Sequence, residues 1–516
     1  MRLDELTAGL SAAGPVAVRG GDARAEISGL AFDSRSVRPG ELFFCVGGFL
    51  RDGHDFAAEA LAKGAAALVL ERPLDLGVPE VVVASARAAM APLAARFYGD
   101  PTAQLRVIGV TGTNGKTTTA YLLRALIEAG GEQCGLLGTV ASVVAGQQRG
   151  VTRTTPEAIE LQRDFRAMLD GGDRACVMEV SSHALELRRT DGIHFAAGVF
   201  TNLTQDHLDF HDTMEDYFQA KRRLFCPHAP GVSVVNAGDP YGRRLAGEID
   251  GVLTFAVDAP ADYSASGLRC ERERTRLRLH TPAGERDLTL GMPGRFNVAN
   301  ALAALATAHA LGADLDVLVK ALELPPRVPG RFEPVDAGQD FTVLVDYAHT
   351  PDSLANVLSA ARELLGGQPE AVPGQGGRVL CVFGAGGDRD RGKRPLMGEI
   401  AAQLADLVLV TSDNPRSEDP EQIIAEIMAG VARVQAATTP ARAGVAPAVR
   451  SISDRREAIA EAVSWGRAGD VLVIAGKGHE QGQELADGRK LPFDDVAVAR
   501  EALTSRAHDM AGAGRG

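Results

Sequence analysis

Short apolar runs alternate with stretches of helical periodicity along most of the 516-residue chain. A short apolar run bounded by turn residues is typical of a buried strand, and apolar positions three or four residues apart are typical of a helix. Strands are predicted at 42–46, 65–70, 81–83, 107–110, 175–180, 197–202, 231–236, 342–346, 379–383, 407–410 and 471–475. Helices are predicted at 55–62, 87–96, 116–129 and 297–311. This alternation predicts an α/β fold.

Two breaks in this pattern divide the chain into three predicted domains. Gly and Pro interrupt it at Tyr98-Gly99-Asp100-Pro101, and three prolines interrupt it between 324 and 330. The predicted domains are 1–103, 104–328 and 329–516. We expect an N-terminal α/β domain, a central doubly wound domain with a strand-rich insert near 263–290, and a C-terminal Rossmann-like domain with an open parallel sheet. A loose tail is predicted at 505–516.

Composition restricts the function classes. Hydrophobic residues make up 45% of the chain and charged residues 23%, which suits a folded globular protein. Acidic residues outnumber basic ones by 67 to 54, so we expect no general binding to nucleic acid. No stretch approaches the roughly 18 apolar residues of a membrane span, so we also expect no membrane insertion. The six cysteines are scattered, which favours a reducing cytoplasm.

The segment 109–119, Gly-Val-Thr-Gly-Thr-Asn-Gly-Lys-Thr-Thr-Thr, lies between a predicted strand and a predicted helix. In this context backbone N–H groups and the helix N-terminus can bind a polyphosphate, while Lys116 supplies positive charge and Thr117 can reach Mg²⁺. The commonest nucleotide-binding loop has glycine five residues before Gly115, where this chain has Val110. The alternative is a glycine-rich turn with an incidental lysine, which the strand and helix on either side disfavour.

This loop resembles that of the Mur ligases and their folylpolyglutamate synthase relatives. Further motifs of that family follow in family order, at 154–156, 178–185, 201–203, 206–211, 294–297, 346–352, 387–390, 413–416 and 476–480. They span all three predicted domains. They are most similar to the motifs of members that add meso-2,6-diaminopimelate to UDP-N-acetylmuramoyl-L-alanyl-D-glutamate.

The resemblance implies a monomeric, cytoplasmic ligase of peptidoglycan precursor synthesis that uses ATP and Mg²⁺. It assigns uridine binding to the N-terminal domain, a P-loop ATPase-like role to the central domain and amino-acid binding to the C-terminal domain. By analogy, the substrate carboxylate attacks the γ-phosphate of ATP, and the amine of diaminopimelate then displaces phosphate from the acyl phosphate. The implied ATP-binding residues are Gly112, Thr113, Asn114, Gly115, Lys116, Thr117, Thr118, Asn297, Arg331, Asp346 and His349.

The resemblance also implies a magnesium site and a set of catalytic residues. The implied metal ligands are Thr117, Glu179, His207 and Lys221. The implied catalytic residues are Lys116, Glu179, His207 and Lys221. Lys221 is carbamylated in such ligases, which gives it the anionic oxygens that magnesium prefers. Taken alone, Glu179 and His207 would be ordinary structural polar residues and Lys221 a solvated helix lysine.

The remaining expected residues bind the two substrates. By resemblance, Ser34 and the loop 49–51 (Phe49, Leu50, Arg51) contact the uridine nucleotide, although Asp33-Ser34 alone would be an ordinary turn. Those implied for the muramoyl dipeptide are Thr154, Thr155, Ser181 and Arg189. Leu187 stands where the family often has Gln, which places one contact in question. The residues that the resemblance implies for binding the amino acid are Arg389, Asp413, Asn414, Pro415, Arg416, Gly476 and Glu480.

Within the amino-acid group, Arg416 can hold a carboxylate with two parallel hydrogen bonds and Asp413 can accept from an ammonium. A salt-bridged surface turn is the alternative. Other members of the superfamily, a P-loop ATPase that moves a partner, and a dehydrogenase remain as alternative functions. The N-terminal uridine-binding segment and the Asp-Asn-Pro-Arg run disfavour the first of these, and the dehydrogenase rests only on a glycine-rich turn at 384–387.

Overall fold

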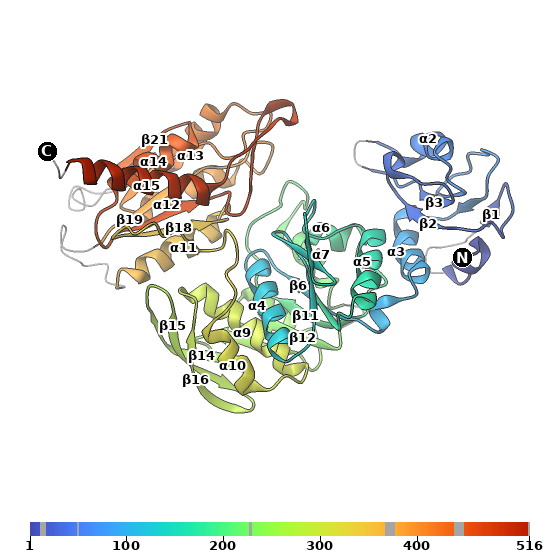
Figure 1. The fold of residues 1–516 in the computed structure, drawn as a ribbon, viewed down its shortest axis with the longest axis horizontal. Coiled ribbons are helices and arrows are strands. Elements are labelled where there is room, and N and C mark those ends of the chain that lie inside the picture. Colours follow the sequence, from blue (N-terminus) through green and yellow to red (C-terminus); the bar gives the residue numbers. More distant parts are fainter. Residues whose placement is uncertain (11–16, 49–50, 227–229, 367–376, 438–447, 514–516) are drawn as a thin grey trace. The chain divides into compact units, whose positions relative to one another are not determined.

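The computed structural model describes residues 1–10, 17–48, 51–226, 230–366, 377–437 and 448–513. The chain forms two compact units, one made of 1–111, 127–199 and 219–233 and the other of 112–126, 200–218 and 234–516 (Figure 1). Both contain sheets and helices, which confirms the predicted α/β class. Among the described residues, no helix is both long enough and apolar enough to span a membrane.

The N-terminal region of the first unit is a small α/β sheet. Its elements are α1 (Leu3–Thr7), β1 (Ala17–Arg19), β2 (Gly29–Ala31), η2 (Ser34–Ser36), β3 (Glu41–Phe44), η3 (Gly53–Phe56), α2 (Ala57–Ala62), β4 (Ala67–Leu70), β5 (Glu80–Val82) and α3 (Ala86–Phe97). The strand order is β1-β5-β4-β3-β2, with only β1 antiparallel to its neighbour. The three apolar runs predicted as strands form β3, β4 and β5. The predicted helix at 55–62 begins instead as the 3-10 turn η3.

The first unit also holds the strands around the nucleotide-binding loop. The elements from here through α7 are η4 (Pro101–Ala103), β6 (Arg106–Thr111), α4 (Lys116–Ala129), β7 (Cys134–Leu137), β8 (Ser142–Val144), β9 (Gln147–Arg149), α5 (Ala158–Asp170), β10 (Ala175–Glu179), α6 (Ser182–Glu186), β11 (Phe195–Phe200) and α7 (Met214–Arg222). The strands lie in the order β11-β6-β10-β7-β8-β9. β10 runs parallel to both β6 and β7, so the carboxyl ends of these strands share one edge.

The second unit begins its own strands with β12. Its next elements are β12 (Val232–Asn236), α8 (Pro240–Ala246), β13 (Leu253–Val257), β14 (Tyr263–Cys270), β15 (Thr275–Thr281), β16 (Gly284–Leu290), α9 (Arg295–Ala310) and α10 (Leu315–Glu323). The strand-rich insert predicted near 263–290 is the antiparallel meander β14, β15 and β16.

The C-terminal sheet is nearly all parallel. Its elements are β17 (Glu333–Pro334), β18 (Thr342–Asp346), α11 (Pro351–Leu364), β19 (Val379–Phe383), α12 (Lys393–Leu404), β20 (Leu407–Val410), α13 (Pro420–Ala437), β21 (Ala448–Ser451), α14 (Arg455–Trp465), β22 (Val471–Ala475), β23 (Gln483–Glu484), η6 (Ala486–Gly488), β24 (Lys490–Leu491) and α15 (Asp495–Ala513). The order is β17-β18-β22-β19-β20-β21, with only β17 antiparallel, while β23 and β24 form a separate pair. The predicted open parallel sheet is thereby confirmed.

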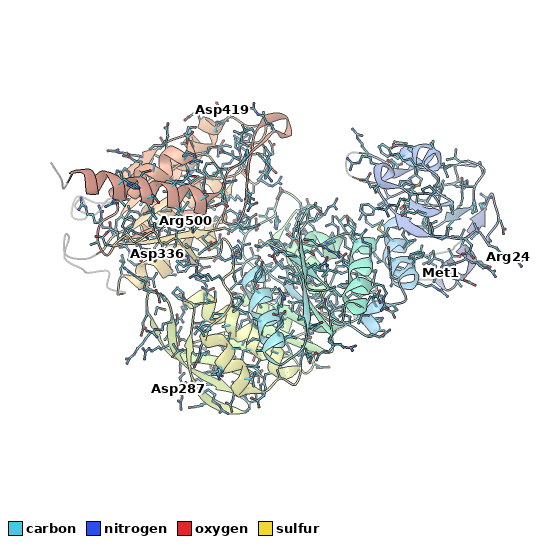
Figure 2. The ribbon with its side chains drawn as sticks, in the orientation of Figure 1. Met1, Arg24, Asp287, Asp336, Asp419 and Arg500 are labelled. Carbon is cyan, nitrogen blue, oxygen red and sulfur yellow. The ribbon has the colours of Figure 1, made fainter. Side chains whose placement is uncertain are left out.

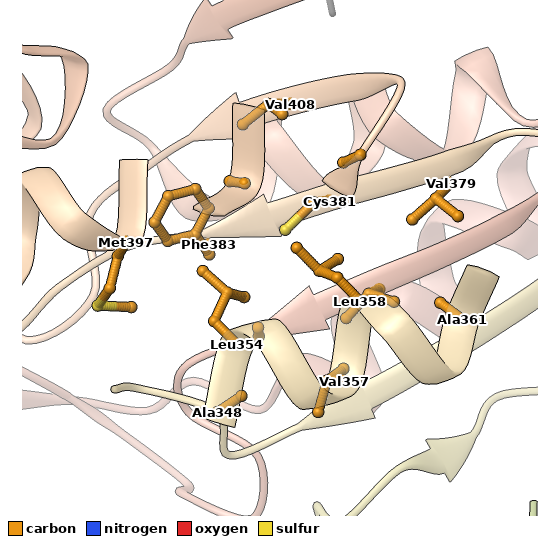
Figure 3. Close-up of a cluster of buried hydrophobic side chains, with 14 of the residues drawn as sticks. Ala348, Leu354, Val357, Leu358, Ala361, Val379, Cys381, Phe383, Met397 and Val408 are labelled. Atoms are coloured by element: carbon orange, nitrogen blue, oxygen red, sulfur yellow. The ribbon is translucent and has the colours of Figure 1, made fainter. Parts of the chain in front are cut away.

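This sheet is buried on both faces. Cys381 and Phe383 of β19 pack with Leu354 and Leu358 of α11 in one apolar cluster, shown in Figure 3. The alternate residues of β19 belong to a second cluster that includes residues of α14 and α15. Alternate side chains of a strand point to opposite faces, and both faces here are covered by helices, which explains the continuous apolar run. Charged side chains such as Asp336, Asp419 and Arg500 lie at the surface (Figure 2).

The predicted loose tail at 505–516 is wrong for its described part, because α15 continues to Ala513. Arg506 explains the order. Its guanidinium donates hydrogen bonds to the carbonyl oxygens of Val463 and Gly466 and lies 5.0 Å from the ring centre of Phe341. These contacts fasten the helix to the domain core, so it does not fray as a free terminus would.

Candidate active site

The loop at 112–119 follows β6 and leads into α4, as the sequence predicted. Lys116 Nζ donates to the carbonyl oxygens of Gly112 and Thr113, each at 2.8 Å, so its ammonium lies over the loop. Gly112 has φ +148°, and a Cβ there would lie 1.9 Å from Thr201 Oγ1. A side chain at this position would therefore displace the loop. The arrangement places a lysine and the N-terminus of a 14-residue helix together, and such a pair is chemically suited to bind phosphate.

Asn114 makes hydrogen bonds through its backbone N–H, its carbonyl oxygen and its side chain. Its backbone N–H donates to Asn202 Oδ1 at 2.9 Å, and its carbonyl oxygen accepts from the hydroxyl of Thr201 at 2.7 Å. Its side-chain Nδ2 donates to Asp352 Oδ2 at 2.7 Å. Thr201, Asn202 and Asp352 therefore support the loop. The sequence showed these residues only as family motifs, because the hydrogen bonds join segments about 90 to 240 residues apart.

The residues predicted to reach ATP from the C-terminal domain lie at the end of β18 and just before β17. Arg331 Nη2 donates to the hydroxyl oxygen of Thr117 at 3.1 Å, so this arginine reaches the nucleotide-binding loop. Asp346 accepts from the backbone N–H groups of Phe332 at 2.6 Å and Ala348 at 2.8 Å. The buried carboxylate thus joins the segment that carries Arg331 to the one that carries His349. Burial raises the pKa of Asp346, and the nearby Arg331 opposes that rise.

His349 is half-buried after β18, and Asn297 is buried on α9. His349 Nδ1 lies 2.8 Å from the carbonyl oxygen of Tyr347, which assigns the proton of a neutral ring to Nδ1. Burial, followed by the positive charge of Lys393, lowers the pKa of His349. Asn297 donates to the carbonyl oxygen of Pro293 at 2.8 Å and its side chain is almost fully buried. This hydrogen bond joins the first turn of α9 to the segment that precedes the helix, which is a structural role.

Glu179 at the end of β10 is the centre of a cluster in the first unit. Its two carboxylate oxygens accept from the backbone N–H of Thr139 at 2.8 Å and from the hydroxyl of Thr139 at 3.0 Å. The Thr139 hydroxyl lies 3.0 Å from that of Thr154. Thr155 donates to the carbonyl oxygen of Glu179 at 2.9 Å and accepts from the Ser181 N–H at 3.1 Å. The structure therefore brings Glu179 together with three of the residues predicted for the muramoyl dipeptide.

Arg189, the fourth of those residues, belongs to the same cluster. Its Nη1 donates to the carbonyl oxygen of Thr155 at 3.1 Å, and its Nη2 lies 2.9 Å from Glu157 Oε1. The pair is largely buried, with side-chain exposures of 13% and 8%. Leu187, where the family often has Gln, follows α6.

The other predicted metal ligands have distinct environments. His207 has φ +54°, and its Nε2 lies 3.4 Å from Asp206 Oδ2. Lys221 is 1% exposed on α7, so the alternative of a solvated helix lysine is wrong. The helix ends at Arg222, and turn hydrogen bonds continue the chain to Phe225. Among the described residues, no three His, Cys, Asp or Glu side chains group into a metal site.

The predicted uridine residues are only partly described. Ser34 donates to Glu59 Oε2 at 3.1 Å, and its carbonyl oxygen accepts from Lys63 Nζ at 2.9 Å. Phe49 and Leu50 lie outside the described residues. Arg51 is exposed, and its carbonyl oxygen accepts from the Gly48 N–H at 2.9 Å.

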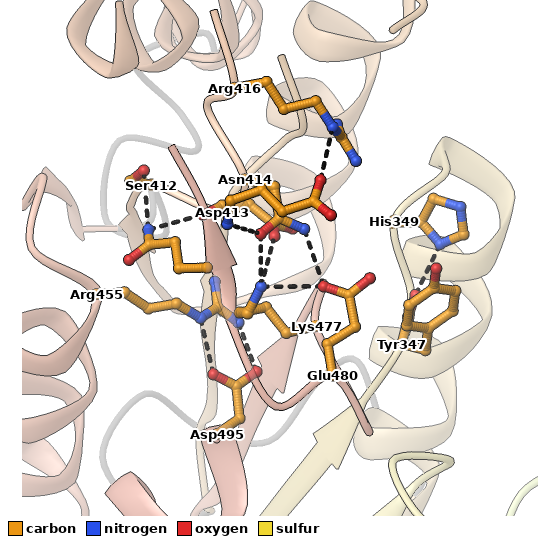
Figure 4. A network of polar contacts seen from close by, with 12 residues as sticks. Tyr347, His349, Ser412, Asp413, Asn414, Arg416, Arg455, Lys477, Glu480 and Asp495 are labelled. Atoms are coloured by element: carbon orange, nitrogen blue, oxygen red, sulfur yellow. Dashed lines mark hydrogen bonds and ion pairs between the residues drawn. The ribbon is translucent and has the colours of Figure 1, made fainter. Parts of the chain in front are cut away.

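Most of the residues predicted to bind the amino-acid substrate lie at the carboxyl ends of β20 and β22 (Figure 4). Ligands bind at this edge of the sheet in open α/β folds. Arg416 Nε donates to Glu484 Oε2 at 2.9 Å and Nη1 donates to the carbonyl oxygen of Gly387 at 2.8 Å. Its other side-chain N–H groups make no hydrogen bond to the residues that the structure describes. Pro415 is buried, whereas Arg389 is exposed and donates to the carbonyl oxygen of Asp388 at 2.9 Å.

Asp413 is 5% exposed, and its Oδ1 makes no hydrogen bond within the described part of the chain. Its nearest cation is Lys477, whose Nζ lies 3.5 Å away. Gly476 has φ +120°, and a Cβ there would lie 2.7 Å from Asp413 Oδ2. A buried carboxylate oxygen without a hydrogen bond is suited to receive a ligand N–H. The site therefore offers a carboxylate at Asp413 and a guanidinium at Arg416, the two charges that an amino acid requires.

Comparisons with known proteins agree with this arrangement. The Mur ligase family catalytic domain matches residues 26–98, the Mur ligase middle domain matches 110–308, and the Mur ligase glutamate ligase domain matches 330–478. The UDP-N-acetylmuramoyl-L-alanyl-D-glutamate--2,6-diaminopimelate ligase of Syntrophomonas wolfei subsp. wolfei is 44% identical over 513 residues, 98% of this chain and 100% of that protein. The chain belongs to the Mur ligase family.

Solved structures of other Mur ligases have the same fold. One of a UDP-N-acetylmuramoyl-L-alanyl-D-glutamate--2,6-diaminopimelate ligase is 34% identical, with a TM-score of 0.65 over 93% of this chain and 96% of that one. The MurF ligase of Thermotoga maritima, solved in complex with ADP, is 20% identical, with a TM-score of 0.59 over 93% and 96% of the two chains. This Mur ligase therefore has the three-domain architecture and the ATP-dependent, amide-bond-forming activity that the motifs predicted. The predicted domain boundaries and site residues stay predictions.

Sequence reasoning about this Mur ligase missed several groups at the amino-acid site. Lys477, Glu484 and the buried pair of Arg455 with Asp495 all surround Asp413 or Arg416, and none was predicted as a site residue. Lys477 lies within a recognised motif, which was its only signal. Glu484 offers none, because its contact depends on the short pair of β23 with β24.

Proposed function

We propose that this Mur ligase joins meso-2,6-diaminopimelate to UDP-N-acetylmuramoyl-L-alanyl-D-glutamate, as a cytoplasmic monomer, using ATP and Mg²⁺. The observation that carries the proposal concerns Asp413 and Arg416. Within the described parts of the chain, Asp413 Oδ1 makes no hydrogen bond and Arg416 has side-chain N–H groups that are not used. An acceptor amino acid with a second carboxylate suits this pair. The names of relatives such as the Syntrophomonas wolfei ligase support the same substrates.

Magnesium fits the chemistry of the residues predicted to hold it. Thr117 offers a hydroxyl, Glu179 a carboxylate and carbamylated Lys221 anionic oxygens, which are hard ligands suited to Mg²⁺. His207 would add an imidazole. The ion would supply charge for the phosphoryl group in transfer. Lys116 would add a cation at the helix N-terminus, so this chain's main contributions are positioning and electrostatic stabilisation.

On the muramoyl side, we propose that Thr154, Thr155, Ser181 and Arg189 hold the dipeptide, and that Ser34 with the 49–51 loop contacts the uridine nucleotide. Thr155 donates to the Glu179 carbonyl oxygen and Arg189 donates to the Thr155 carbonyl oxygen. These two hydrogen bonds support the assignment, because they connect the predicted dipeptide residues to the end of β10.

Phosphate release by the purified protein tests the function. ATP, Mg²⁺ and UDP-N-acetylmuramoyl-L-alanyl-D-glutamate are combined with a panel that includes meso-2,6-diaminopimelate, lysine, alanine and glutamate. We expect release that requires both the nucleotide substrate and diaminopimelate. Release that needs neither would instead indicate an ATPase, and preference for lysine would give the ligase another acceptor.

A further inference from the structure

Lys477 carries a fully buried ammonium at the amino-acid site (Figure 4). It follows β22 in the chain, yet it contacts residues that follow β20. Its Nζ donates to Asn414 Oδ1 at 2.8 Å and to Glu480 Oε2 at 3.0 Å, and it lies 3.5 Å from Asp413 Oδ1. Two of the three ammonium donors bond to Asn414 and Glu480, and the Asp413 carboxylate is an ion-pair partner at the longer distance. One side chain thus joins two loops that are about 65 residues apart.

The ammonium also fixes how its neighbours face the site. Asn414 Oδ1 accepts from Lys477 and from the Glu484 N–H at 3.0 Å, so Asn414 Nδ2 points the other way and donates to Glu480 Oε2 at 2.9 Å. Glu480 therefore uses one oxygen inside the cluster, and its second oxygen makes no hydrogen bond to the described residues. Lys477 thus adds the charged hydrogen bond to each of Asn414 and Glu480, beside the neutral ones that they make with the Glu484 N–H and with each other.

Charge gives Lys477 a second effect. Asp413 and Glu480 carry two negative charges and Lys477 one positive charge, so these three side chains together keep a single negative charge. Arg455 does not alter this balance, because Asp495 pairs with its Nε and Nη2 at 2.8 and 2.7 Å and neutralises its charge. One negative charge in a buried site matches one ligand ammonium, whereas two adjacent buried carboxylates would repel each other.

We propose that Lys477 is a positioning residue of the amino-acid site, which orients Asn414 and Glu480 and sets the charge that receives the ammonium of the acceptor amino acid. The inference rests on the proposed function. It assigns to Lys477 no direct contact with the reacting atoms. Its effect should therefore appear in the binding of the amino acid and in no other binding step.

The test compares Lys477→Met, which keeps the aliphatic stem and removes the ammonium, with Lys320→Met at an exposed position of α10. Phosphate release is measured against each of the three substrates in turn. We expect the KM for diaminopimelate to rise at least about tenfold, the loss expected when a charge-assisted hydrogen bond is removed. The KM values for ATP and for the UDP-linked dipeptide should stay within about twofold of wild type.

Chemical rescue separates positioning from packing. Lys477→Ala leaves space for the removed propylammonium group, so added propylammonium should lower the KM for diaminopimelate, whereas propanol should not. Product is quantified directly, so that propylammonium acting as an acceptor is recognised. An unchanged KM for diaminopimelate in Lys477→Met would overturn the inference, as would equal rises in all three KM values that propylammonium fails to reverse. Wild-type protein without diaminopimelate-dependent release would count against the proposed function instead.

Discussion

Arg416→Ala tests whether the acceptor is chosen by its second carboxylate. The guanidinium has five N–H donors, of which Nε is used by Glu484 and one on Nη1 by the Gly387 carbonyl. The remaining donors on Nη1 and Nη2 form a fork that can hold a carboxylate through two hydrogen bonds. Diaminopimelate has a carboxylate at the far end of its side chain, and lysine has none. Lysine would therefore leave this fork unpaired.

A charge-assisted contact of this kind is worth roughly 1.5–3 kcal/mol, which corresponds to a loss of about 10- to 150-fold in kcat/KM. We expect Arg416→Ala to lose that much with diaminopimelate and less than about threefold with lysine, already a poor acceptor. Stability should change little, because Glu484 is 42% exposed and water can solvate it once its partner is removed.

The measurement is kcat/KM for both amino acids in wild type, in Arg416→Ala and in Arg433→Ala, whose guanidinium pairs with Glu399 at an exposed site. The surface variant should match wild type with both. Equal losses with lysine and diaminopimelate in Arg416→Ala would refute the selective role of Arg416. An unchanged kcat/KM with diaminopimelate would remove this arginine from the site.

Four further variants probe the rest of the molecule. Asp413→Ala should lower kcat/KM similarly for diaminopimelate and lysine, because both bring an ammonium; a loss confined to one would contradict this. Lys116→Ala should abolish phosphate release and keep the wild-type circular dichroism, and turnover at the normal rate would remove the lysine from catalysis. Lys221→Ala should be nearly inactive and partly rescued by a small carboxylate such as acetate, so full activity would exclude a carbamate. Asp495→Ala should cost about 3–5 kcal/mol in urea unfolding, because it leaves Arg455 buried without its partner, and a cost under about 1 kcal/mol would show that water reaches the arginine.

The C-terminal strands could be predicted from sequence because they are buried on both faces. Four apolar runs became β18, β19, β20 and β22 with the same first and last residues. A strand covered by helices on both sides needs apolar residues at every position, and the polar residues at its ends mark where burial stops. The same reasoning found the loop between β6 and α4, because its glycines and lysine lie between two strongly patterned elements.

The errors have a different origin, since they depend on contacts between distant segments. The C-terminal part of α15 was not predicted as a helix. It is stabilised by hydrogen bonds from Arg506 to carbonyl oxygens near residue 465, and the local sequence pattern does not reveal contacts between such distant residues. The role of Lys477 was missed for a related reason. A lysine is most often exposed. That Lys477 is instead buried against Asn414 and Glu480 is seen only in the folded structure.

One residue links the nucleotide and amino-acid groups of the C-terminal domain. Tyr347 follows β18, and its ring lies 4.4 Å from the guanidinium carbon of Arg331, 4.6 Å from the ring centre of His349 and 5.2 Å from that of His479. Arg331 reaches the nucleotide-binding loop, while His479 directly precedes Glu480 of the amino-acid site. The parallel sheet places the carboxyl ends of β18, β22 and β20 at one edge, so groups for phosphate and for the amine lie on neighbouring loops. If the proposed ligation proceeds through an acyl phosphate, loops at one edge of the sheet would hold the phosphate and the incoming amine, and holding two reactants close together is a principal source of rate enhancement.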